Sequence, residues 1–223
     1  MTRRARCYGK GLAALSLTVV ALLATGCGTP QFTYVADSTA STYFKVPSGW
    51  HKVDDASLMA QLGGAKSGFG PQNGVWEVAY DAAPSPVAAH VFSPADQPFA
   101  FALVVPLNKT ATNSMSYNGL RDFLLPVTPP DRQAAAQRGF PLNRFQLLRD
   151  SVLGPGPAGV HGVRVTFDYT YPTGSTDTFD QVALTNAVDT KVYVLIIHCV
   201  ATCYRQHHNE IESVMTSFTV GNK

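Results

Sequence analysis

The sequence predicts an α+β fold, a single α/β/α sandwich in which a central antiparallel sheet is flanked by helices. Three observations support this prediction. Apolar and polar residues alternate over 163–171, as in an antiparallel strand with one buried face. Residues 192–197 are apolar at every position, which is typical of a central strand covered on both faces. Segments with helical spacing precede and follow these strands and would supply the covers.

The N-terminal part of the expected domain combines strands with one short helix. An extended run over 43–46 leads into 47–49, where Pro-Ser-Gly indicates a turn. Residues 54–62 favour a helix, because an aspartate can cap its first turn and leucines follow at i, i+4 spacing. Apolar residues, several of them β-branched or aromatic, predict strands over 75–80 and 99–105.

Two helices are expected in the middle of the chain. Residues 115–125 carry apolar side chains at helical spacing, and Pro126 would end that helix. Residues 129–137 begin with prolines, which suit the first turn of a helix, and Gly139 would terminate it. These helices would cover one face of the sheet.

Four consecutive antiparallel strands and a closing helix are expected in the C-terminal half. The strands span 145–152, 163–171, 178–185 and 191–198, with turn residues between them. The helix spans about 204–218 and would be the second cover, because its apolar residues form one stripe. This stripe consists of Ile211, Val214, Met215 and Phe218.

This order of elements resembles the PsbP/Mog1-like sandwich found in many small secreted lipoproteins of high-GC Gram-positive bacteria. The resemblance covers roughly residues 42–220 and depends on three segments, FKVPSGW at 44–50, GVRVTFDY at 162–169 and MTSF at 215–218. It implies an antiparallel sheet with flanking helices. It implies an accessory, binding or assembly role and no shared catalytic residues, so no functional residue transfers with it.

The first 26 residues have the composition of an export signal. A basic start, with Arg3, Arg4, Arg6 and Lys10, precedes an apolar or small stretch over 11–25. That stretch has about 15 residues, fewer than the roughly 20 that a membrane-spanning helix needs. Secretory and twin-arginine export both remain open.

The signal ends in Leu-Ala-Thr-Gly-Cys at 23–27, which resembles a lipobox. In a lipobox the cysteine is lipidated and becomes the mature N-terminus, although leucine more often stands where this chain has Ala24. An ordinary signal peptide followed by a chance cysteine is the alternative. The resemblance implies that Cys27 carries the lipid and holds the chain on the extracytoplasmic face of the cell membrane.

The expected organisation is therefore a signal peptide at 1–26, lipidated Cys27 with a flexible tether to 41, and one globular domain at 42–223. Of the 17 Lys and Arg residues, four precede Cys27, so 13 remain against 15 Asp and Glu residues. The mature chain would carry a formal net charge of −2, and it has no cluster of basic residues. This balance argues against nucleic acid as a partner.

Two cysteines near the end of the last predicted strand form a candidate disulfide. Cys199 and Cys203 are four residues apart, which on a helix places their Cα atoms about 6 Å from one another, within disulfide range. An oxidising compartment permits the bond. The alternative is a metal site using His198, Cys199, Cys203 and His207, because thiolate with imidazole suits zinc or copper. The disulfide is the preferred prediction, and no metal or cofactor is expected.

No catalytic motif is present. The chain lacks the nucleophile elbow, the phosphate loop and the zinc-protease helix motif, although a Ser/His/Asp triad could still assemble from distant residues. Trp50 and Trp76 would be a ligand platform or core residues, and the core is preferred. The expected function is therefore non-enzymatic, with an envelope protein or a small hydrophobic ligand as the partner. An envelope hydrolase and a metal-binding lipoprotein are the alternatives.

Overall fold

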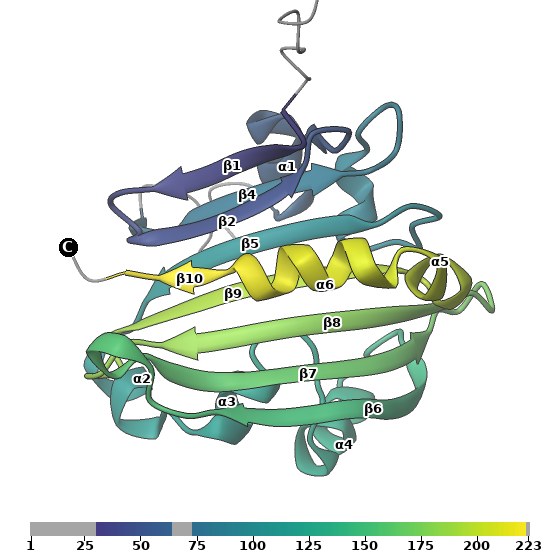
Figure 1. Cartoon of the computed structure of the whole chain (residues 1–223). Helices are drawn as coiled ribbons and strands as arrows, with labels where there is room; N and C mark the ends of the chain where they lie inside the picture. The colour runs from purple at the N-terminus through teal and green to yellow at the C-terminus, as the bar shows by residue number, and fades with distance from the viewer. Residues whose placement is uncertain (1–29, 64–72, 222–223) are drawn as a thin grey trace, which may run out of the picture. The chain divides into compact units, whose positions relative to one another are not determined.

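A computed structural model describes residues 30–63 and 73–221, and most of the described strands belong to one antiparallel sheet (Figure 1). The expected signal peptide and Cys27 lie outside the described residues. The strands of this sheet are β3 (His51–Lys52), β4 (Trp76–Asp81), β5 (Phe99–Pro106), β6 (Asn143–Leu153), β7 (His161–Thr170), β8 (Thr176–Thr185) and β9 (Lys191–Val200). Their order is β3-β4-β5-β9-β8-β7-β6, so the four C-terminal strands pair consecutively, as the sequence predicts.

One face of the large sheet is covered by the last helix and a small second sheet (Figure 1). The elements of this cover are β1 (Phe32–Asp37), β2 (Thr42–Pro47), α5 (Ala201–Gln206), α6 (His208–Ser217) and β10 (Thr219–Val220). Strand β2 pairs with both β1 and β10. The core between the layers contains Phe44, Leu195 and Ile211, all at most 1% exposed. This cover is therefore part sheet and part helix, whereas the sequence predicts helix alone.

Short helices cover the opposite face. They are α1 (Asp55–Gln61), the 3-10 turn η3 (Ala88–Val91), α3 (Tyr117–Arg121) and α4 (Pro129–Gln137), whereas α2 (Lys109–Ser114) has no buried residue. A further 3-10 turn, η4 (Pro157–Gly159), links β6 to β7. Leu58 of α1 and Leu120 of α3 are each 1% exposed and join the same core as Phe99 and Phe167 of the sheet. The α/β/α sandwich is therefore confirmed.

The expected tether at 27–41 is wrong over part of its length. Residues 32–37 form β1, which pairs in antiparallel register with β2. Val35 faces the core and is 7% exposed, opposite Phe44 in the register. The small and polar residues around this strand hide its alternation in the sequence, and the folded part of the chain begins about ten residues earlier than predicted.

Two predicted helices differ in extent. The helix expected over 115–125 is shortened to α3, because the Asp122 carboxylate accepts hydrogen bonds from the amides of Val127 and Thr128, both at 2.7 Å, and so closes a turn. The helix expected over 204–218 begins earlier, directly after β9, and is divided at His207 into α5 and α6. The expected apolar stripe nevertheless lies on α6 and at the residue after it, and it faces the core.

Candidate functional site

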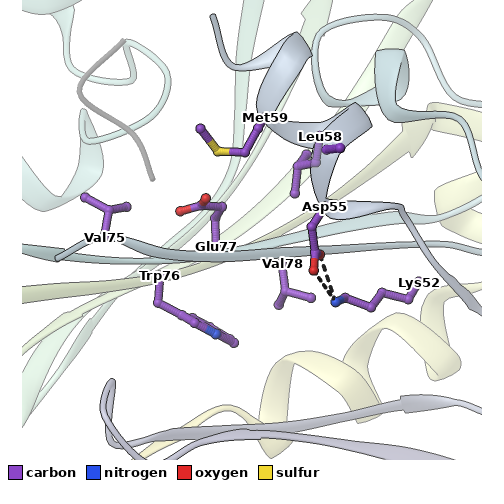
Figure 2. Close-up of a pocket in the computed structure, with 9 residues that line it drawn as sticks. Lys52, Asp55, Leu58, Met59, Val75, Trp76, Glu77 and Val78 are labelled. Atoms are coloured by element: carbon purple, nitrogen blue, oxygen red, sulfur yellow. Dashed lines mark hydrogen bonds and ion pairs between the residues drawn. The ribbon is translucent and has the colours of Figure 1, made fainter. Parts of the chain in front are cut away.

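An open hollow of about 410 Å³ lies between helix α1 and strand β4 (Figure 2). Leu58 and Met59 approach it from the helix, and Val75 and Glu77 approach it from the strand side. Trp76 leaves β4 on the side opposite to Glu77, as neighbouring residues of a strand do, and also lines the hollow. Most of the lining residues are apolar. The carboxylate of Glu77 lies among them, between Met59 and Val75, and the charged groups of Lys52 and Asp55 lie at the margin (Figure 2).

Local sequence explains how α1 is held beside β4. Asp54 caps the helix, with its Oδ2 accepting hydrogen bonds from the amide of Ser57 at 2.9 Å and from its hydroxyl at 3.0 Å. These bonds to the backbone and side chain of Ser57 lower the pKa of Asp54. The amide of Val53 donates to the carbonyl of Ala79 at 2.9 Å and so ties the residue before the cap to β4. Leu58 anchors the helix in the core, which leaves the next residue, Met59, at the hollow.

Lys52 and Asp55 form an ion pair at the margin of the hollow, with Nζ 2.8 Å from Oδ1 (Figure 2). The two side chains are 49% and 69% exposed. A pair this exposed contributes at most about 1 kcal/mol to stability. Either group can therefore exchange its partner for a charged group of a ligand at little cost.

A second hollow of about 710 Å³ adjoins the first and shares Lys52 and Asp55 with it. It lies on the side of α1 that faces η3, and Pro86, Val87 and Ala88 are among its lining residues. The exposed ion pair thus stands between two hollows. Apart from Trp76, no residue of either lining stands out in the sequence, because the lining residues come from separate segments and share no motif.

Two histidine–aspartate pairs, one of them fully buried, flank Phe99 at one end of the sheet. His90 Nδ1 lies 2.8 Å from Asp81 Oδ2, and His198 Nδ1 lies 3.0 Å from Asp177 Oδ2. The ring centroids of His90 and His198 are 6.0 Å and 5.7 Å from that of Phe99. Both aspartates are 0% exposed, and Asp81 also accepts from two amides of the following loop. Asp177 accepts the amide of Ala95 at 3.4 Å, so both aspartates fasten the loop before β5 to the sheet.

A serine, a histidine and an aspartate do meet around a small pocket of about 170 Å³, at Ser116, His161 and Asp189. Their contacts differ from those of a catalytic triad. His161 Nδ1 lies 3.0 Å from the carbonyl oxygen of Gly159, and its Nε2 faces Asp189 Oδ1 at 3.6 Å. The Ser116 hydroxyl instead accepts the amide of Gly119 and caps α3. A base nitrogen directed at the carboxylate cannot activate the hydroxyl, so this cluster does not support the hydrolase alternative.

The predicted pair of cysteines is joined by a disulfide. Cys199 at the end of β9 and Cys203 in α5 have Cα atoms 5.9 Å apart, and both side chains are buried. Because both sulfur atoms are used in the disulfide, neither cysteine is a thiolate that could bind the metal of the alternative prediction. His207 Nδ1 lies 2.9 Å from Glu210 Oε2, and within residues 30–63 and 73–221 no cluster of three potential ligands suits a metal ion.

The two tryptophans have different surroundings. Trp50 is a core residue, 5% exposed, and its indole Nε1 donates to Glu210 Oε1 at 2.8 Å. Trp76 is half-buried and lines the hollow beside β4. They do not form a shared platform.

The described helices include none that is both long and apolar enough to cross a bilayer.

The fold is similar to solved structures of low sequence identity. Cyanobacterial PsbP from Synechocystis has a TM-score of 0.53 and 12% identity, covering 88% of this chain and 96% of that one. The Ran-binding protein Mog1p from Saccharomyces cerevisiae has a TM-score of 0.45 and 8% identity, covering 85% and 95%. LpqN of Mycobacterium tuberculosis, involved in cell envelope biogenesis, has a TM-score of 0.41 and 14% identity, covering 86% and 91%.

No protein-family model and no curated protein sequence matches the chain. At such low identity, structural similarity establishes the fold alone. The chain has the PsbP/Mog1-like fold, an antiparallel sheet between two covering layers.

Proposed function

We propose that the chain is an extracytoplasmic lipoprotein, anchored to the cell membrane through lipid on Cys27, that binds a ligand rather than catalysing a reaction. The hollow beside β4 is the observation that carries the binding role. Its apolar lining suits the apolar part of a small amphipathic ligand, and the Lys52–Asp55 pair at its margin suits a charged or polar head. The lipobox-like segment at 23–27 supports the anchor.

The volume of the hollow is consistent with such a ligand. Small-molecule sites typically occupy about 300–1,000 Å³ and combine an apolar lining with a few polar groups. The hollow of about 410 Å³ falls in this range. Met59, Val75 and Trp76 contribute its apolar lining.

The binding role is tested by filling the hollow with a large side chain placed at an exposed residue that lines it. Ala56 is exposed on α1 and lines the hollow, so Ala56→Trp should fill it without disturbing the core. Ala60, one turn further along α1, is also exposed but lines only the adjoining hollow, which makes Ala60→Trp a matched control. We expect native mass spectra of protein extracted from its own membrane to show a bound small molecule, which is lost in Ala56→Trp and retained in Ala60→Trp. An equal signal in both variants, or none in the unaltered protein, contradicts the proposal.

The anchor is tested separately. Cys27→Ala should move the protein from the membrane fraction to the soluble fraction, because the lipidated side chain is gone. Cys7→Ala is the matched control, since Cys7 precedes the expected cleavage site and should leave fractionation unchanged. Retention of Cys27→Ala in the membrane would contradict the anchor.

A further inference from the structure

The outer face of the β1–β2 hairpin is unusually aromatic. In both strands alternate residues are directed away from the core, and on this face they include Phe32, Tyr34, Tyr43 and Lys45. Tyr34 is 66% exposed. A sheet face that meets only water is normally polar, so this surface, which we call the hairpin face, fits an interaction with another surface.

The side chains of the hairpin face form two adjacent pairs. The rings of Tyr34 and Tyr43 are stacked with centroids 6.1 Å apart. The Nζ of Lys45 lies 4.1 Å from the centroid of the Phe32 ring. Tyr34 is exposed and Tyr43 is half-buried. Tyrosine, and lysine with its apolar stem, are residue types that settle at the boundary between lipid head groups and acyl chains.

The position of the hairpin along the chain identifies the surface that it meets. Only residues 28–31 separate Cys27 from Phe32, the first residue of β1. Even a fully extended chain of that length spans at most about 18 Å from Cys27 to Phe32. A six-residue strand is about 20 Å long. With lipid on Cys27, the hairpin is therefore held within about its own length of the bilayer surface.

We propose that the hairpin face lies against the membrane, with Tyr34 and Tyr43 in the head-group region and Lys45 directed to phosphate oxygens. This inference rests on the proposed lipid anchor. The anchor supplies attachment, and the hairpin face sets how the domain is oriented on the bilayer. The occupant is the lipid surface itself, not a second protein.

The test places a fluorescent reporter on the hairpin face. The mature, lipidated protein with Tyr34→Trp is reconstituted into vesicles of phosphatidylcholine and phosphatidylglycerol, some with brominated acyl chains. Val152→Trp is the matched control, because Val152 is 53% exposed on β6, at the far edge of the large sheet (Figure 1). The emission of the unaltered protein, from Trp50 and Trp76, is subtracted.

We expect brominated lipid to quench Tyr34→Trp at least about twofold more strongly than Val152→Trp, and aqueous iodide to quench Val152→Trp more strongly, because only the hairpin face reaches the interface. If the protein floats with the vesicles but brominated lipid quenches Tyr34→Trp and Val152→Trp equally, the inference is overturned and the anchor stays intact. Protection of Tyr34→Trp from iodide without quenching by lipid would mean that protein covers the face, which also overturns it. Failure of the protein to float with vesicles removes the anchor and the inference with it.

Discussion

Arg164 of β7 and Asp180 of β8 are joined by two hydrogen bonds inside the protein, Nε to Oδ1 at 2.9 Å and Nη2 to Oδ2 at 2.7 Å. Asp180 is 0% exposed and Arg164 is 6% exposed. Glu212 of α6 accepts from the same guanidinium, and the Tyr204 hydroxyl donates to Asp180 at 2.8 Å. Burial alone would lower the pKa of Arg164, but the hydrogen bonds to Asp180 and Glu212 raise it. This cluster connects the sheet to its C-terminal helices.

Arg164→Ala should lower the free energy of unfolding by about 3–5 kcal/mol, because it leaves the buried Asp180 carboxylate without its counter-charge. Urea titration followed by circular dichroism measures this loss. Arg164→Met combined with Asp180→Leu is the control. Since this double variant removes both charges and keeps much of the side-chain volume, it should recover most of the stability that Arg164→Ala loses. A double variant as unstable as Arg164→Ala would show that the charge pair is not the cause.

Glu212 should make stability sensitive to acid. The hydrogen bond from Arg164 lowers the pKa of Glu212 below its ordinary value of 4.5, so the native state favours the carboxylate. The contribution of Glu212 to the free energy of unfolding is therefore complete above pH 4.5, and it is lost as the pH falls through the lowered pKa of the folded state. Glu212→Gln should be less stable than the unaltered protein near neutral pH, and the difference in the free energy of unfolding should shrink as the pH falls below 4.5. Urea midpoints at several pH values measure it, and a constant difference would contradict the assignment.

The Cys199–Cys203 disulfide should contribute to global stability at the lower end of the range that is typical of disulfides. It closes a very short loop, for which the chain-entropy model gives about 2 kcal/mol. Cys199→Ala combined with Cys203→Ala should lower the free energy of unfolding by about that amount, as should treatment of the unaltered protein with a reductant. The reductant should leave the double variant unchanged. A further loss in the reduced double variant would point to an effect unrelated to this bond.

The large sheet could be predicted from sequence because its residues repeat a pattern that burial imposes. Strand β7 alternates and β9 is apolar throughout, and both patterns follow directly from which faces are covered. The small strand β1 has only Val35 in the core, so its pattern is too weak to distinguish from a tether.

The site residues could not be predicted in the same way. The hollow brings Lys52 and Met59 from one segment against Trp76 from another, and no spacing rule connects them. The partner of His198, Asp177, is likewise 21 residues away on another strand. Only the cysteine pair, a local contact within one turn of chain, was visible in the sequence.

Gly162 on β7 should tolerate no side chain. A Cβ there would overlap the carbonyl oxygen of Ala183 and lie 2.8 Å from the Cα of Leu184, and both are backbone atoms of the neighbouring interior strand β8 that cannot move aside. Gly162→Ala should therefore lower the free energy of unfolding by about 3 kcal/mol, the upper part of the range for overpacking. Gly154→Ala is the matched control, since nothing lies within 4 Å of its added Cβ. Urea titration of both variants measures the difference, and equal stabilities would mean that β7 and β8 do not approach as closely as this register requires.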